Sequence, residues 1–114
     1  MTPKKGNVYL AELPRDGNQQ SGIRPVIVTQ NDKGCAYGPR VHVVPLSTRI
    51  DKAKHLPTHV LIYPSQSNGL SKPSVALTES LVSIQKDNLI REFGAIDPID
   101  YDRVARAIRT HLAV

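Results

Sequence analysis

An arginine that directly precedes a proline, Arg24 in the stretch SGIRPVIVTQND (21–32), is the first candidate for chemistry in this chain. Proline disfavours helical geometry in the residue before it, so Arg24 is expected to hold an extended backbone that aims its side chain reproducibly. A guanidinium group stays charged at any working pH and pairs its donors with phosphate oxygens. Arg24 is therefore a candidate phosphate-binding residue, against the alternative of an ordinary surface ion pair.

Two hydroxyl side chains, Ser47 and Thr48, follow an apolar run that ends in Pro45 and Leu46. If that run is a strand, alternation sends the two hydroxyls to opposite faces, so at most one of them points into a cleft shared with Arg24. A hydroxyl near an arginine can hold a phosphate oxygen or relay a proton, but near neutral pH it depends on such neighbours. Turn formation or capping is the alternative role for both residues.

The histidines and the single cysteine give no second constellation. Imidazole titrates near neutrality and suits acid–base chemistry, but the spacing of His42, His55, His59 and His111 specifies no pair. No histidine or carboxylate cluster has metal-ligand spacing, and no phosphate-loop or dinucleotide glycine pattern occurs. We expect neither a metal nor another cofactor, and Cys35 is expected to be an incidental thiol in a reducing compartment.

The frame that must position these residues is predicted to consist mainly of strands. Residues 85–94 are expected to contain a helical turn or short helix, and from Asp97 to Leu112 the apolar spacing predicts a terminal amphipathic helix capped by Asp97. The 114 residues therefore predict one domain over 1–114, α+β but mainly β, with an antiparallel sheet or small barrel of about five or more strands and a C-terminal helix. Alternating or apolar runs bounded by turn residues predict the strands at 8–13, 24–30, 40–46, 58–63 and 74–84.

The charge balance favours a polyanionic partner. Fifteen Lys and Arg against ten Asp and Glu give a net charge of +5 and a pI near 9.6. Several of these cations fall in predicted loops, where they would form an electrostatic funnel for phosphates. No stretch approaches the roughly 20 apolar residues of a membrane helix, so we expect a cytoplasmic protein.

Five segments in register give the chain its likeness to a known family. They are GNVYLAEL, GNQQSGIRPVIVTQND, VVPLST, KHLPTHVLI and GLSKPSVALTES. Over nearly its full length the chain resembles the MazF/PemK endoribonuclease toxins, whose members share the CcdB-like fold. The second segment is similar to a loop and strand that commonly read Gly-Ser-Glu-Gln-x-Gly-x-Arg-Pro in that family, and the third to a strand end that usually reads Pro-Leu-Thr-Ser.

The resemblance implies an SH3-like barrel with appended helices, usually a homodimer. It implies a metal-independent, sequence-specific endoribonuclease that cuts single-stranded RNA by attack of the 2′-hydroxyl and leaves a 2′,3′-cyclic phosphate and a 5′-hydroxyl. A cognate antitoxin would inhibit it by occupying the RNA groove. Two alternatives remain open, namely a CcdB-like toxin that poisons a DNA topoisomerase such as gyrase without cutting anything, and a cleavage-dead RNA-binding domain.

The resemblance also assigns roles to residues. Arg24 matches the catalytic arginine of the family, and Ser47 falls where the catalytic threonine usually stands. A one-residue shift of the loop would give that role to Thr48, so both hydroxyls stay candidates. The residues implied in RNA binding are Gln19, Gln20, Ser21, Gly22, Asn31, Lys52, Lys54, Ser74, Glu79 and Ser80.

Two positions depart from the family pattern. Gln19 stands where the family commonly has Glu, which removes a carboxylate that could take a proton. Ser80 replaces a frequent Gln after Glu79, which is expected to alter base recognition. Neither departure touches Arg24.

Overall fold

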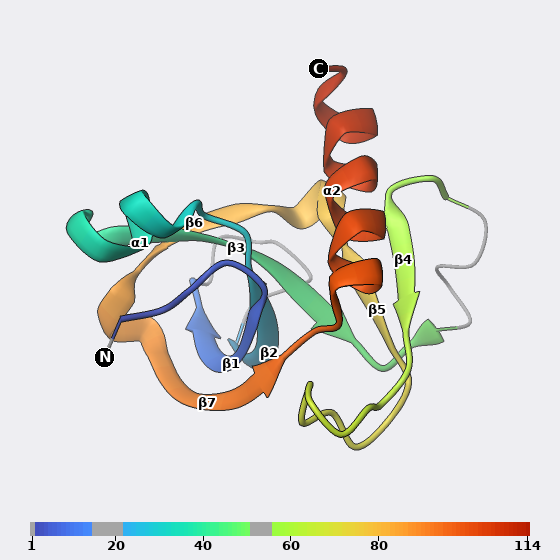
Figure 1. The fold of residues 1–114 in the computed structure, drawn as a ribbon, viewed down its shortest axis with the longest axis horizontal. Helices are drawn as coiled ribbons and strands as arrows, with labels where there is room; N and C mark the ends of the chain where they lie inside the picture. The colour runs from blue at the N-terminus through green and yellow to red at the C-terminus, as the bar shows by residue number, and fades with distance from the viewer. Residues whose placement is uncertain (1, 15–21, 51–55) are drawn as a thin grey trace.

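An antiparallel sheet forms the frame of the computed structural model, which describes residues 2–14, 22–50 and 56–114. The described residues form seven strands. Six of them follow the order β4-β5-β3-β2-β1-β7, and the seventh, β6, pairs with β3 off this path (Figure 1). The sheet is not closed into a barrel within these ranges. The elements are β1 (Asn7–Leu13), β2 (Gly22–Val28), α1 (Asp32–Tyr37), β3 (Arg40–Ser47), β4 (His59–Ile62), β5 (Ser74–Leu77), β6 (Val82–Gln85), β7 (Leu89–Ala95) and α2 (Pro98–Leu112).

Most buried side chains gather in two clusters on opposite faces of the sheet. Alternation along β2 serves both, because Val26 and Val28 join one cluster and Ile27 joins the other. Each such side chain stabilises the fold by about 1.5–3 kcal/mol when fully buried. We call one of the two clusters the inner cluster. It consists of Tyr9, Ala11, Leu13, Val26, Val28, Cys35, Val41, Val43, Ile84 and Leu89. The helix-side cluster includes Val8, Ile27, Val44, Leu46, Val60, Ile62, Leu70, Ala76, Ile96, Val104 and Ala107.

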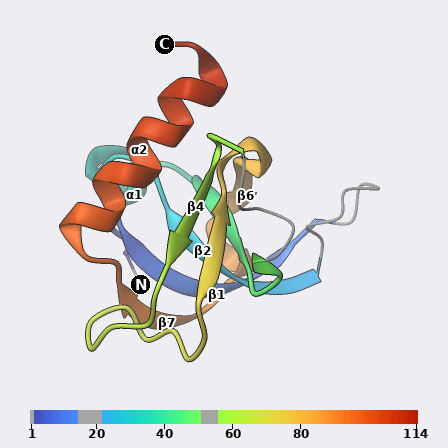
Figure 2. The ribbon, with the colours of Figure 1, turned by 90° about the vertical axis from the view of Figure 1, so that its right-hand side faces the viewer.

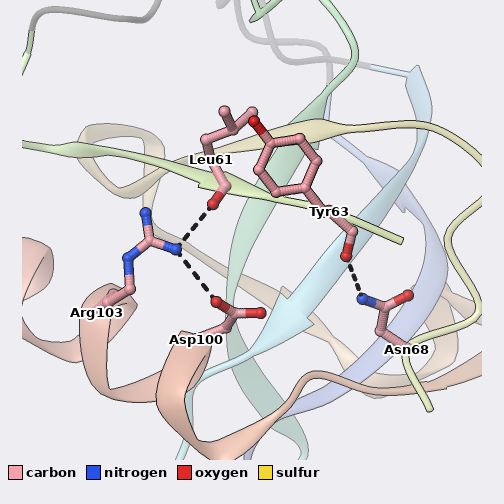
Figure 3. A network of polar contacts seen from close by, with 5 residues as sticks. All are labelled: Leu61, Tyr63, Asn68, Asp100 and Arg103. Atoms are coloured by element: carbon pink, nitrogen blue, oxygen red, sulfur yellow. Dashed lines mark hydrogen bonds and ion pairs between the residues drawn. The ribbon is translucent and has the colours of Figure 1, made fainter. Parts of the chain in front are cut away.

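Helix α2 covers the helix-side cluster and stands beside β4, as both ribbon views show (Figures 1 and 2). The helix buries Val104, as the spacing predicts, and also Ala107, which lies outside the predicted stripe. Leu112, the last residue of that stripe, is 50% exposed. Arg103 fastens the helix to the sheet, because its Nη1 donates to the carbonyl oxygen of Leu61 at 3.0 Å and to Oδ1 of Asp100 at 3.1 Å (Figure 3). The antiparallel, mainly β fold with a C-terminal helix is therefore confirmed.

Asp97 occupies the N-cap position of α2, but its side chain caps nothing. Its Oδ1 instead accepts a hydrogen bond of 2.6 Å from Oγ of Ser67. The prediction of a helix start at this residue is right, and the predicted side-chain cap is wrong, because the loop before β5 competes for the carboxylate.

Three predicted segments differ from the structure. The connection 31–39 contains α1, which Asn31 caps by accepting from the backbone N of Gly34 at 2.8 Å. The predicted strand 74–84 is broken by a 3-10 turn, Thr78–Ser80, where Oγ1 of Thr78 donates to the carbonyl oxygen of Thr58 at 2.6 Å.

The predicted helix within 85–94 is also wrong. Only Lys86–Asn88 form a 3-10 turn, and Leu89–Ala95 form β7, which pairs with β1. The local helical preference of these residues is overridden, because the backbone groups on the free edge of β1 need hydrogen-bond partners and β7 supplies them. None of the helices in the described ranges is long and apolar enough to cross a membrane.

Candidate active site

Arg24 lies in the first half of β2, before the strand enters the core. It pairs with Ala11 of β1, and strand alternation puts it on the face that carries Val26 and Val28. The residue is half-buried. The following Pro25 pairs with Leu10 and sits on the opposite face. The extended backbone predicted for Arg24 is confirmed.

The two hydroxyl candidates end β3 on opposite sides. β2 pairs with β3 from Val28–Val43 to Val26–Pro45, and alternation beyond that last pair puts Arg24 and Ser47 on the same face of the sheet. Ser47 itself pairs with Val75 of β5. Ser47 is 9% exposed, and its Oγ accepts a hydrogen bond of 3.2 Å from the backbone N of Arg49. Thr48 is exposed and falls on the face of Pro25. The register therefore groups Ser47, and not Thr48, with Arg24.

A cleft of about 330 Å³ opens on the Pro25 side of these strand ends. It brings together Thr48 and Ser74, two of the predicted site residues, although their segments are far apart in sequence. Ser74 is buried, and its Oγ donates to the carbonyl oxygen of Lys72 at 3.1 Å. The lining residues are Pro25, Thr48, Gly69, Leu70, Ser71, Lys72, Ser74, Arg91, Glu92 and Phe93.

One wall of this cleft comes from the loop 64–73, which is organised around Asn68. Asn68 is fully buried, and its Nδ2 donates to the carbonyl oxygen of Tyr63 at 2.9 Å (Figure 3). Its Oδ1 accepts from the backbone N of Ser65 at 3.1 Å and of Leu70 at 2.9 Å. Because the amide satisfies backbone groups on both sides, the loop holds one shape.

Glu79 and Ser80 lie in the 3-10 turn between β5 and β6. The carboxylate of Glu79 contacts Nε2 of His59, the first residue of β4, at 2.6 Å. Burial alone would raise the pKa of Glu79, but hydrogen bonds from His59, its own backbone and Thr58 outweigh it and lower the pKa below the ordinary value. Glu79 is therefore ionised near neutral pH and is 37% exposed toward solvent.

The other predicted residues in the described ranges either lie apart from Arg24 or shape the backbone through a turn or a helix cap. Gly22 begins β2 with φ of +90°, a conformation that favours glycine. Asn31 uses its side-chain oxygen to cap α1. His42 lies in β3, with Nδ1 2.7 Å from Oε1 of Gln30, so the two histidines in strands, His42 and His59, contact different residues. Gln19, Gln20, Ser21, Lys52, Lys54 and His55 lie outside the described residues.

Sequence reasoning counted Lys72 only among the cations expected to attract phosphates, and it missed Arg91 and Asn68. Lys72 and Arg91 are exposed cations of the cleft, and Arg91 stands over the ring of Phe93 with Cζ 4.8 Å from the ring centroid. The misassignment of β7 hid Arg91, because only a strand paired with β1 carries it to the cleft. Asn68 had a weak signal, since Asn before Gly is typical of turns. Over the described ranges, no three His, Cys, Asp or Glu side chains gather as metal ligands.

Comparison with known proteins gives the family of the chain. The model of the PemK-like, MazF-like toxins of type II toxin–antitoxin systems matches residues 4–112. Endoribonuclease MazF of Staphylococcus saprophyticus is 47% identical over 97% of this chain and 92% of its own length. Endoribonuclease EndoA of Bacillus subtilis is 39% identical over 100% of this chain and 97% of its own length.

A solved structure of an endoribonuclease in complex with its cognate antitoxin, from Mycobacterial species, shares the fold. Its TM-score is 0.79 at 22% identity, with 98% of this chain and 96% of that chain covered. The chain belongs to the PemK-like, MazF-like toxin family. The resemblance drawn from the five sequence segments is thereby confirmed.

Proposed function

We propose that this protein is an endoribonuclease toxin that cuts single-stranded RNA at the open ends of β2 and β3. The observation that carries the proposal is that Arg24 and Ser47 share one face of the sheet at the ends of β2 and β3, in a chain 47% identical to an endoribonuclease. A fixed cation and a hydroxyl on neighbouring strands suit the charge that develops on a phosphate during transfer. The match to relatives named endoribonucleases also favours cleavage over poisoning of a topoisomerase.

In the proposed reaction the substrate supplies its own nucleophile. The 2′-oxygen bonds to the phosphorus, the bond from phosphorus to the 5′-oxygen breaks, the 2′-proton leaves to water, and a proton joins the 5′-oxygen. The products are a 2′,3′-cyclic phosphate and a 5′-hydroxyl. The enzyme therefore has to hold the 2′-oxygen in line and stabilise the phosphorane-like charge, and neither task requires a metal ion.

Arg24 stabilises that charge through its paired donors, and the hydroxyl of Ser47 orients a non-bridging oxygen or passes the proton to the leaving oxygen. The near-complete burial of Ser47 supports this role, because a hydroxyl in a fixed position loses little freedom when substrate binds. Thr48, on the Pro25 side, stays the alternative that mutation has to test.

RNA recognition falls to residues around these strand ends. Ser74, Glu79 and Ser80 offer hydroxyl and carboxylate contacts to base edges, and unstacked single-stranded bases expose those edges. From the segments outside the described residues, Gln19, Gln20 and Ser21 are assigned to bases, and Lys52 and Lys54 to backbone phosphates. Gly22 and Asn31 act by shaping the neighbouring backbone.

A cognate antitoxin and a second copy of the chain are the proposed protein partners. The antitoxin is supported by the related endoribonuclease that was solved in complex with its own. We place the protein in the cytoplasm, where messenger RNA is its substrate, and propose that it acts as a homodimer. Inhibition of RNA cleavage by the antitoxin, and the mass of the free protein in solution, test these two partners separately.

Incubation with a long mixed RNA in EDTA, followed by sequencing of the cut ends, tests the proposal. The expected result is cleavage at one short motif with cyclic phosphate and 5′-hydroxyl ends, while DNA of the same sequence survives. Intact RNA would contradict it. Intact RNA that still binds would favour the cleavage-dead alternative, which the absence of a carboxylate at Gln19 makes worth testing.

A further inference from the structure

The cleft on the Pro25 side begins one residue beyond the candidate catalytic pair. Pro25 follows Arg24 and Thr48 follows Ser47, and both Pro25 and Thr48 line the cleft. The cleft and the candidate pair therefore lie on opposite faces of the same strand ends. An RNA strand held at Arg24 and Ser47 that passes over these ends brings a neighbouring nucleotide to the cleft. Its volume of about 330 Å³ lies at the lower end of the range for small-molecule sites, which suits a single nucleotide.

The walls of the cleft are cationic and hydroxyl-bearing. The lining holds two cations, Lys72 and Arg91, and one carboxylate, Glu92. Glu92 accepts a hydrogen bond of 2.6 Å from Nδ2 of Asn7. The cleft thus keeps an excess positive charge. Hydroxyls of Thr48 and Ser71 stand among these groups. This combination matches a phosphate and a sugar better than an apolar ligand.

Arg91 lies against an aromatic ring. Its guanidinium stands over the ring of Phe93, with Cζ 4.8 Å from the centroid, and the residue is exposed. Single-stranded bases stack on arginine planes as well as on aromatic rings. With only four tyrosines and one phenylalanine in the chain, this pair is a rare stacking surface.

The loop that carries Lys72 is built to hold its place against β7. Gly69 has φ of +70°, and a Cβ built there would collide with the carbonyl oxygen of Phe93. Ala95 of β7 donates to the carbonyl oxygen of Ser67 at 2.8 Å, and the ribbon views place this loop beside β7 (Figures 1 and 2). Lys72 and Arg91 are therefore presented by two elements in fixed contact, which lowers the cost of binding.

We propose that this cleft is a nucleotide subsite, in which Arg91 on Phe93 stacks the base next to the scissile bond and Lys72 binds its phosphate. The inference rests on the proposed RNA cleavage. It adds a surface, Arg91 on Phe93, on which one base of the substrate stacks. An acidic protein segment is the competing ligand, but the stacked guanidinium and the hydroxyls favour a nucleotide.

The stacking role is tested with Arg91→Lys, which keeps the charge and loses the plane. The substrate is an RNA with one mapped cleavage motif, compared with copies that carry an abasic residue on either side of the cut. Stacking of one base contributes enough that the abasic copy should be cut about tenfold more slowly by the wild-type protein. The Arg91→Lys protein should cut the intact RNA about tenfold more slowly and show no further loss on the abasic copy, because one contact is lost only once.

The phosphate role is tested with Lys72→Gln. Loss of one phosphate contact to a single strand should reduce the slope of log affinity against log salt by about 0.7. Lys33→Gln, an exposed cation on α1, and Arg109→Lys, an exposed cation on α2, are matched controls that should behave like the wild-type protein. All four variants should keep the wild-type melting temperature, since each changed side chain is exposed.

The outcomes separate this inference from the proposed function. If the wild-type protein leaves RNA intact, the proposed function fails. If it cuts RNA but the Arg91→Lys and abasic losses multiply, or the Lys72→Gln slope is unchanged, the subsite is overturned and the cleavage proposal stands. Normal cleavage by both variants with weaker binding of a poly-glutamate peptide would assign the cleft to a protein ligand and also overturn the subsite.

Discussion

The two halves of strand β2 face different surroundings although they are continuous. Val26, Ile27 and Val28 are fully buried, whereas Ile23 is 62% exposed and Arg24 is half-buried. Strand β3 repeats this contrast, since its apolar residues are buried up to Leu46 and the chain becomes exposed at Thr48. The packed halves fix the strand directions. The open end of β2, Gly22–Pro25, and the end of β3, where buried Ser47 is followed by exposed Thr48, take their positions from these halves.

This comparison teaches where a substitution should act. A change in a packed half removes buried apolar area and lowers stability. A change in an open end removes a functional group from a frame that stays folded. The predictions below test that division, from the largest effect to the smallest.

Arg24→Ala should abolish RNA cleavage while leaving the fold intact. Loss of one group that stabilises developing charge lowers the rate by about 100- to 1,000-fold. Cleavage rates at saturating RNA, together with thermal unfolding followed by circular dichroism, measure both effects. Arg24→Lys, which keeps the charge but loses the paired donors, should recover only part of the rate. A variant that unfolds much more easily, and whose folded fraction still cuts RNA, would make Arg24 a structural residue.

Ile27→Ala should have the opposite signature. Truncation of this fully buried side chain should lower the free energy of unfolding by about 2–5 kcal/mol, because it leaves a cavity in the helix-side cluster. Ile23→Ala, in the open end of the same strand, is the matched control and should change the stability by about 0.5 kcal/mol or less. Urea unfolding of both variants measures the difference. Equal losses would break the comparison between the two halves of β2.

The hydroxyl pair sharpens the comparison within one open end. Ser47→Ala should slow cleavage by about 10- to 100-fold, since a positioned acid or hydrogen-bond donor contributes on this scale. Thr48→Ala should retain most of the rate, because the register sets Thr48 on the Pro25 side. Single-turnover rates on one RNA decide between them. A loss confined to Thr48→Ala would assign the role to Thr48 and overturn the register argument.

The smallest effect concerns Glu79, which lies outside β2 and β3 in the 3-10 turn after β5. Its pKa is lowered in the folded protein, so its carboxylate stabilises the fold above the ordinary pKa and loses that contribution as the pH falls through the lowered value. Glu79→Gln should therefore cost about 0.2–1 kcal/mol near neutral pH, because the Glu79 carboxylate is partly exposed and contacts His59 at 2.6 Å, and nothing in strong acid. Unfolding measured across this pH range tests it, with Asp87→Asn, an exposed carboxylate in the turn before β7, as control. A cost that persists in acid would show that packing, not charge, connects Glu79 to His59.

The sequence predicted those parts of the fold that local patterns decide. Apolar alternation located β1, β3 and β4, and the spacing from Asp97 to Leu112 located α2. It failed where tertiary pairing overrides local preference, as at Leu89–Ala95, which form a strand because β1 offers an edge. It also failed at Thr78, where a hydroxyl bond to Thr58 breaks the predicted strand.

The candidate site was predictable in part for the same reason. Arg24 and the two hydroxyls stand beside apolar runs, so pattern alone placed them at strand ends. Register was needed to separate Ser47 from Thr48, and register depends on pairing between distant segments. The contribution of Lys72 and Arg91 to a cleft with Thr48 also required the paired strands and the loop around Asn68.

The central claim is that the open ends of β2 and β3 hold RNA so that its own 2′-oxygen attacks the phosphate. The most direct test replaces the single nucleotide on the 5′ side of the mapped cut by its 2′-deoxy form and measures cleavage and binding together. The account predicts that this RNA binds with unchanged affinity and is not cut at that bond. Cleavage of the deoxy substrate at the same bond, or a 5′-phosphate on the product, would contradict it.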